Sequence, residues 1–154
     1  MTATSSIAPL VKTATVPCPP ERAFDLFTQQ ISAWWPLATH SVGLSPDCRV
    51  EMDGRVGGHI TETLPDGATT SWGTLTAWEP PSRVAFTWHP GRDPDEATEV
   101  QVVFKPAADS GTVVTLVHGG WSARPDGAAA RRNYEAGWDP VLTRLRSAAG
   151  VPTR

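Results

Sequence analysis

The sequence predicts an α+β domain in which one long helix, near the end of the chain, packs against an antiparallel sheet. Apolar residues recur at steps of three and four through residues 128–149, which is the spacing of one face of a helix. Most of the chain before this helix alternates in polarity. It is also interrupted at short intervals by 15 Pro and 13 Gly, a pattern typical of several strands joined by turns.

The first elements are predicted to be a strand, a helix and a short helical turn. Residues 10–16 alternate in polarity and form the strand, which the following prolines end. Pro20 suits the first turn of a helix, and apolar residues at helical spacing continue that helix to about Gln29. A second short helix or turn covers residues 31–35. We expect residues 1–8 to be a flexible terminus of this single domain, 1–154.

A loop and six more strands are predicted next. Residues 36–47 have no period and several breakers, and a loop of about a dozen residues is uncommon unless it has a function. The strands are predicted at 48–52, 58–64, 69–78, 83–88, 98–105 and 112–118, with turn residues between them. The whole sheet therefore has about seven strands.

The long helix contains a proline near its middle. Pro140 removes one backbone hydrogen bond and is expected to kink the helix near residues 136–137. We expect Gly137 to tolerate this bend and to let the helix approach the sheet closely. Tyr134, before the kink, is expected at a cavity, whereas Leu142 and Leu145, after it, are expected in ordinary core.

Composition and charge argue against several classes of protein. The net charge is −3 and no run of basic residues exists, so we expect no nucleic-acid partner. No apolar stretch reaches the roughly 18 residues that a membrane span needs. The first residues lack a basic, then apolar, signal pattern, so we expect a cytoplasmic protein. Cys18 and Cys48 are expected to be free thiols.

No convincing catalytic or metal-binding set is present in the sequence. The four His and two Cys share no helical pair or close spacing, so we expect no metal and no cofactor. His118 is the single catalytic candidate. It shares a strand face with Val114 and Leu116, so it should point inward, where it could orient a ligand or act as a base. The alternative is a hydrogen-bonded histidine that holds the turn at Gly119–Gly120.

The aromatic residues give the stronger signal of function. Seven Trp against one Tyr exceed what a small core usually needs, and some of this flat surface could line an adaptable apolar pocket. The alternative is that these side chains are simply core. The predicted ligand-binding residues are Trp34, Trp35, His40, Phe86, Trp88, His118, Trp121, Tyr134 and Trp138. We expect the Tyr134 hydroxyl, His118 and indole N–H groups to orient the ligand.

Several local signatures occur in a specific order along most of the chain. They are Pro20-Glu21-Arg22-Ala23-Phe24, Trp34-Trp35-Pro36, Arg55-Val56-Gly57-Gly58, Pro80-Pro81 with Arg83, Val84, Phe86 and Trp88, His118-Gly119-Gly120-Trp121, and Gly137-Trp138 with Val141-Leu142. In this order the chain resembles the helix-grip superfamily of START and birch-pollen-allergen-like domains. Within that superfamily it resembles the activator of heat-shock-protein-90 ATPase homologue family. The resemblance implies a curved antiparallel sheet that grips the last helix, with a cavity between them.

Three hypotheses for function follow. The leading one is a binding module for a small, mostly hydrophobic or aromatic molecule, which is then its expected partner. The second is an enzyme of the polyketide cyclase, dehydratase or hydrolase type that uses the same cavity, with His118 as acid–base. The third is a co-chaperone-like interaction domain. A homodimer is a further possibility that the sequence leaves open.

Overall fold

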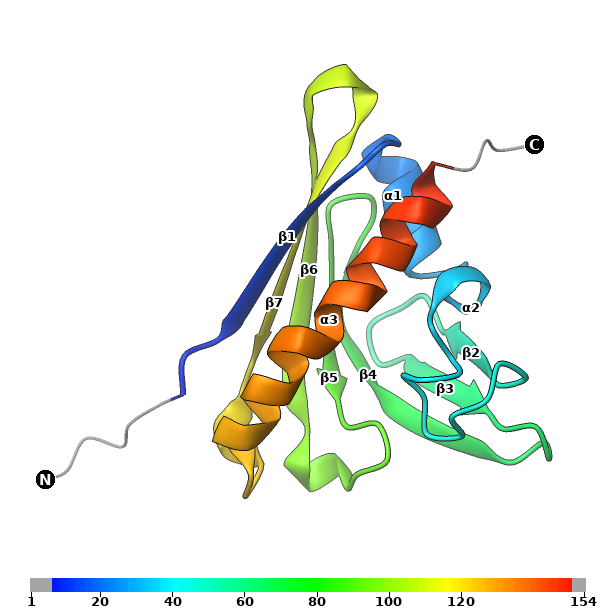
Figure 1. Ribbon diagram of the computed structural model, residues 1–154, viewed down its shortest axis with the longest axis vertical. Coiled ribbons are helices and arrows are strands. Elements are labelled where there is room, and N and C mark those ends of the chain that lie inside the picture. The colour runs from blue at the N-terminus through cyan, green and yellow to red at the C-terminus, as the bar shows by residue number, and fades with distance from the viewer. Residues whose placement is uncertain (1–6, 151–154) are drawn as a thin grey trace, which may run out of the picture.

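The computed structural model describes residues 7–150, in which one strand, two short helices, six further strands and a long helix follow one another (Figure 1). The strands are β1 (Leu10–Val16), β2 (Arg49–Met52), β3 (His59–Thr63), β4 (Thr69–Glu79), β5 (Arg83–Trp88), β6 (Thr98–Pro106) and β7 (Thr112–Gly119). The helices are α1 (Pro20–Phe27), α2 (Ile31–Trp34) and α3 (Gly127–Ala149). Most of the stretch 1–8, for which we predict flexibility, lies outside the described residues.

All seven strands form one antiparallel sheet in the order β1-β7-β6-β5-β4-β3-β2. The first strand pairs with the last, so that Leu10 lies opposite His118. Each of the other neighbours is consecutive in sequence, as a meander requires. The sheet curls around one face of α3 (Figure 1). The predicted α+β helix-grip fold is therefore confirmed.

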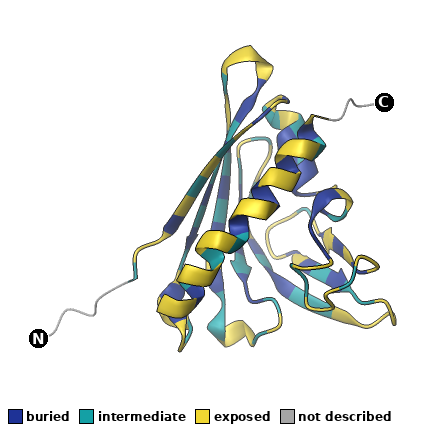
Figure 2. Cartoon of the chain, viewed as in Figure 1, coloured by how far each residue is buried: buried dark blue, intermediate teal, exposed yellow. Residues whose placement is uncertain are grey.

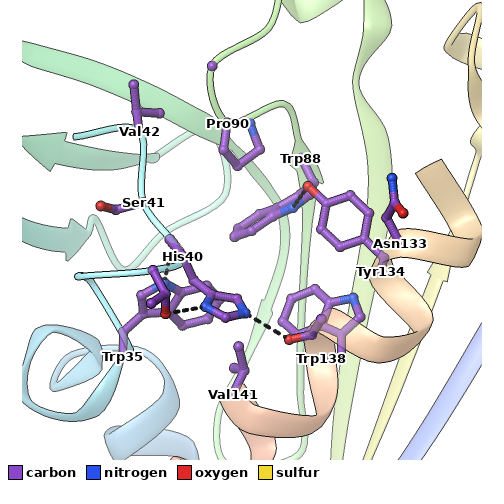
Figure 3. A pocket seen from close by; sticks show the side chains of 13 residues that line it. Trp35, His40, Ser41, Val42, Trp88, Pro90, Asn133, Tyr134, Trp138 and Val141 are labelled. Carbon is purple, nitrogen blue, oxygen red and sulfur yellow. Dashed lines mark hydrogen bonds between the residues drawn. The ribbon is translucent and has the colours of Figure 1, made fainter. Parts of the chain in front are cut away.

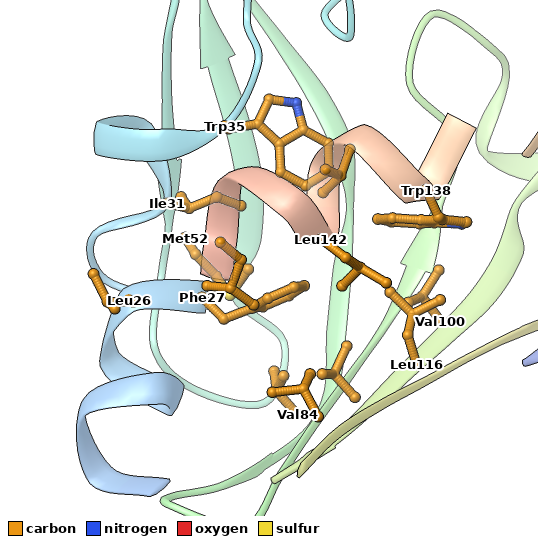
Figure 4. Close-up of a cluster of buried hydrophobic side chains, with 14 of the residues drawn as sticks. Leu26, Phe27, Ile31, Trp35, Met52, Val84, Val100, Leu116, Trp138 and Leu142 are labelled. Carbon is orange, nitrogen blue, oxygen red and sulfur yellow. The ribbon is translucent and has the colours of Figure 1, made fainter. Parts of the chain in front are cut away.

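The core lies between the sheet and the inner face of α3. In β7 alternate side chains point toward the helix, which leaves Val114, Leu116 and His118 fully buried. Figure 2 shows the same separation on α3, where a buried stripe faces the sheet and the opposite side is exposed. Trp138 and Leu142 bring this stripe into a cluster that also contains Phe27 of α1 (Figure 4). The predicted positions of Leu142 and Leu145 in the core are confirmed.

Helix α3 is continuous through Pro140 and differs from the prediction at Gly137. A Cβ atom built on Gly137 would meet no other atom within 4 Å. The expectation that this glycine allows close contact between helix and sheet is therefore wrong. Gly137 instead faces open space, at the edge of a pocket that it helps to line.

Candidate functional site

A pocket of about 440 Å³ opens beside Gly137, between α3, the end of β5 and the long loop that follows α2 (Figure 3). Loop residues 39–42 form one wall, and residues 133–141 in the middle of α3 form the other. Its lining consists of Trp35, Thr39, His40, Ser41, Val42, Trp88, Pro90, Gly91, Asn133, Tyr134, Gly137, Trp138 and Val141. The loop predicted at residues 36–47, which is unusually long, thus forms one side of the pocket.

Four aromatic side chains give the pocket a nearly continuous apolar surface. The ring centroids of Trp35 and Trp88 are 5.9 Å apart, and those of Trp88 and Trp138 are 5.8 Å apart. Tyr134 continues the series, with its ring centroid 6.2 Å from that of Trp138. The three indoles are almost fully buried, so each offers the pocket only part of its surface and packs into the core with the rest. Such a wall is held rigidly in place.

The indole N–H groups of this wall all donate to acceptors inside the protein. Trp35 Nε1 donates to the carbonyl oxygen of His40 over 2.8 Å, and Trp138 Nε1 donates to His118 Nδ1 over 3.0 Å. Trp88 Nε1 donates to the hydroxyl oxygen of Tyr134 over 3.1 Å. An indole has one N–H and no acceptor, so these three groups have no hydrogen left for a ligand. The expectation that indole N–H groups of the pocket orient the ligand is therefore wrong.

His40 connects the loop to α3 across the pocket wall. Its Nε2 lies 3.1 Å from the carbonyl oxygen of Gly137, and its Nδ1 lies 2.7 Å from Thr39 Oγ1. Because a carbonyl can only accept, Nε2 carries a hydrogen and donates it to Gly137, while Nδ1 pairs with the Thr39 hydroxyl. The imidazole therefore reaches the helix backbone at Gly137. His40 is half-buried.

The same loop is anchored from the other side by a buried carboxylate. Glu62 of β3 is fully buried and accepts hydrogen bonds from the backbone N–H groups of Val42, over 2.9 Å, and Gly43, over 3.0 Å. Trp72 Nε1 donates to the same carboxylate over 2.8 Å. Burial favours a raised pKa for Glu62, but the bonds from Gly43, Val42, the Cys48 thiol and Trp72 hold that pKa below its ordinary value. Glu62 is therefore a charged anchor, and within residues 7–150 it has no ion-pair partner.

His118, the single catalytic candidate, lies in the core and does not line the pocket. Its Nδ1 accepts from Trp138, and its Nε2 donates to Thr98 Oγ1 over 2.6 Å. Burial, with a smaller contribution from the charge of Arg124, lowers the pKa of His118 from 6.5 to about 3. The ring is therefore neutral and both nitrogens are occupied. This geometry corrects the expectation that His118 acts on a ligand, and it matches the alternative of a hydrogen-bonded structural histidine.

The structure brings five of the nine predicted ligand-binding residues to the pocket and places the other four in the core. Those at the pocket are Trp35, His40, Trp88, Tyr134 and Trp138. Trp34 donates its Nε1 to the carbonyl oxygen of Leu26 over 2.7 Å and packs on Phe27. Phe86 lies between Phe27 and Trp88. Trp121 packs on His118 with ring centroids 4.0 Å apart. For these four residues the alternative of ordinary core packing fits better.

Sequence reasoning missed several residues that line or support the pocket, although some signals were present. Asn133, Gly137 and Val141 recur at steps of four beside Tyr134, so the helical period already placed them on one face. Glu62 shares a strand face with the buried Ile60, and this alternation could have indicated a buried carboxylate. Nothing in the sequence indicated that Pro90 and Gly91 line the pocket, because turn residues do not show which other segment the turn faces.

Two further observations concern membrane-spanning helices and metal sites. Within residues 7–150, no helix combines the length and the apolar character that crossing a membrane requires. In the same part of the chain, no three side chains of His, Cys, Asp or Glu gather closely enough to hold a metal ion.

Solved structures share this fold along nearly the whole chain. A protein described as an anthrahydroquino-gamma-pyrone synthase, Txn09, complexed with SUM, is 29% identical with a TM-score of 0.65, covering 94% of this chain and 99% of that chain. The Aha1 dimer from Colwellia psychrerythraea is 18% identical with a TM-score of 0.67, covering 94% of this chain and 98% of that chain. CalU16 from Micromonospora echinospora is 19% identical with a TM-score of 0.64, covering 92% of this chain and 76% of that chain.

A comparison with curated proteins found no match. The model of one family, described as Activator of Hsp90 ATPase homolog 1-like protein, matches residues 17–150, which include every helix and all strands except β1. That match spans most of the chain and both walls of the pocket. The chain therefore belongs to the family of Activator of Hsp90 ATPase homolog 1-like proteins.

Proposed function

We propose that this protein binds a small, mostly apolar or aromatic molecule in the pocket between α3, the end of β5 and the 36–47 loop. The observation that carries the proposal is the pocket itself. Its volume of about 440 Å³ falls within the roughly 300–1,000 Å³ of small-molecule sites, and most of its enclosing surface is aromatic or aliphatic. Affinity would come mainly from removing apolar surface from water.

The surroundings of the pocket support binding rather than incomplete packing. His40 ties the loop to the helix and Glu62 ties the same loop to the sheet, so specific hydrogen bonds fix the position of the loop wall. Gly137 keeps the helix wall free of a side chain. The related synthase that was solved as a complex supports ligand binding on this fold. The neighbour described as a dimer is in line with the homodimer that the sequence leaves open, and sedimentation equilibrium would test it.

Two substitutions at Gly137 provide the sharpest test. Gly137→Ala adds a methyl group in open space, whereas Gly137→Phe fills the pocket with a ring from the same backbone position. Tryptophan fluorescence should respond to a panel of polycyclic aromatic ligands, because three of the seven tryptophans line the pocket. We expect the wild-type protein and Gly137→Ala to bind, and Gly137→Phe to remain folded but lose the response.

A different result would contradict the proposal. If no ligand of the panel changes the fluorescence at concentrations of tens of micromolar, the pocket is not a site for this class. If Gly137→Phe binds as well as Gly137→Ala, the ligand is bound elsewhere.

An enzyme is the second candidate, and one observation favours it. His40 lines the pocket with one nitrogen on a hydroxyl and the other fixed by a backbone carbonyl, which is how a general base is often oriented. The related structure is described as an anthrahydroquino-gamma-pyrone synthase, which gives this candidate its reaction class, the formation of a gamma-pyrone. Turnover that is lost in His40→Gln, with ligand affinity retained, would support it. Equal turnover in both proteins would contradict it.

A further inference from the structure

The hydroxyl group of Tyr134 has an unused hydrogen at the pocket. Trp88 Nε1 lies 3.1 Å from the Tyr134 oxygen, and an indole nitrogen can only donate, so the oxygen is the acceptor of this bond. Among residues 7–150, no acceptor lies within hydrogen-bonding distance of the Tyr134 hydroxyl hydrogen. Figure 3 shows the phenol extending from α3 toward Trp88, with its oxygen beside the indole nitrogen.

The other polar side chains inside the pocket have their hydrogens committed. The three indoles donate within the protein, as described above. His40 donates to Gly137, the Thr39 hydroxyl has both His40 Nδ1 and the Pro36 carbonyl as acceptors within the loop, and the Ser41 hydroxyl donates to the Leu37 carbonyl over 2.6 Å. Asn133 also lines the pocket, but it is exposed at the rim. Within the described chain, Tyr134 is thus the one half-buried side chain of the pocket whose donor hydrogen is left for a ligand.

The surroundings of Tyr134 keep it a hydrogen-bond donor. Burial raises the pKa of its phenol, whereas the N–H of Trp88 and the positive charge of Arg124 oppose that rise. The net direction is upward, so the phenol remains protonated at neutral pH. A donor N–H and a cation on the oxygen side also polarise the O–H bond, which strengthens its donation to an acceptor.

We propose that Tyr134 is the specificity-determining donor of this pocket and that the natural ligand carries a carbonyl oxygen, or an equivalent acceptor, on its aromatic or polycyclic frame. This inference rests on the proposed function, and it adds the chemical class of the ligand. The aromatic walls accept any flat apolar molecule of suitable size. One directed hydrogen bond then selects the ligand that places an oxygen at Tyr134 and fixes its orientation in the pocket.

Fluorenone and fluorene test the inference as a matched pair. They share a flat tricyclic frame and differ in a carbonyl group against a methylene group. Isothermal titration calorimetry of the wild-type protein should give fluorenone about tenfold higher affinity than fluorene, the size expected for one hydrogen bond to a buried donor. In Tyr134→Phe this preference should disappear. The fluorene affinity of that variant serves as the internal control for an intact pocket.

The carbonyl stretching frequency of bound fluorenone gives a second, independent readout. A hydrogen bond from Tyr134 should lower this frequency in the wild-type complex, and the Tyr134→Phe complex should lack the shift. If the role of Tyr134 is merely structural, Tyr134→Phe should weaken the binding of both ligands. The carbonyl frequency of bound fluorenone should then be the same in the wild-type and Tyr134→Phe complexes.

The outcomes separate the two proposals. Equal affinity of the wild-type protein for both molecules, or a preference that persists in Tyr134→Phe, would overturn the assignment of Tyr134 while leaving the pocket as a binding site. Failure of both molecules to bind the wild-type protein would overturn the assignment together with the proposed function.

Discussion

Replacing Glu62 with glutamine removes the charge that holds the 36–47 loop against the sheet. The carboxylate accepts from Val42, Gly43 and Trp72, and the amide nitrogen of glutamine must face at least one of these donors. A hydrogen bond to a charged group contributes roughly 1.5–3 kcal/mol, and an orphaned buried donor costs about 1–3 kcal/mol. We therefore expect Glu62→Gln to lower the free energy of unfolding by about 3 kcal/mol, a large fraction of the roughly 5–15 kcal/mol typical of a domain.

Urea denaturation at pH 7, followed by tryptophan fluorescence, measures this loss. Glu51→Gln is the matched control, because it makes the same chemical change on an exposed side chain of the neighbouring strand. The control should change stability by less than about 0.5 kcal/mol. Amide hydrogen exchange at Val42 and Gly43 should accelerate in Glu62→Gln alone. If the two variants are equally stable, or if these amides keep their protection, Glu62 is not the anchor of the loop.

Three further predictions concern α3 and His118. Gly137→Ala should raise the free energy of unfolding by about 1 kcal/mol, because alanine favours the helix and its methyl group meets no atom; an unchanged or lower urea midpoint would contradict this. The folded-state pKa of His118 is about 3 and lies below its ordinary 6.5, so the unfolded chain binds the extra proton first. His118 should therefore make stability fall by up to about 1.4 kcal/mol per pH unit as the pH drops from about 6.5 toward about 3, and His118→Gln should flatten that slope in a pH series of melts. Trp138→Phe leaves His118 Nδ1 without its donor, so it should cost about 1–3 kcal/mol and raise the pKa of His118, as NMR titration of the imidazole would report.

The fold could be predicted because its signals are local. The helical period of residues 128–149 and the alternation in each strand depend on neighbours a few residues away, and they gave seven strands and α3 within a residue or two. The alternation in β7 also placed Val114, Leu116 and His118 correctly toward the core. Those same rules established that His118 points inward, but not what it meets there.

The site depends on contacts between residues far apart in sequence, which local patterns do not contain. His40 meets the backbone of Gly137, and Glu62 meets Val42 through a loop that has no period. Trp35 faces the pocket, whereas Trp34 faces the core. The two directions depend on the backbone angles where α2 ends, and a pair of adjacent tryptophans in the sequence does not reveal these angles. The sequence does not decide whether Gly137 packs closely or faces open space, because glycine suits both surroundings.

The most direct test of the central claim is an NMR titration of the protein with fluorenone, in which backbone amide shifts locate the bound molecule. The account predicts shifts concentrated at residues 39–42, at Gly91 and at residues 133–141, the two walls and the rim of the pocket. Shifts should be small at β1 and at the far end of α3. No saturable shifts, or saturable shifts centred away from these residues, would contradict the claim that this pocket is the binding site.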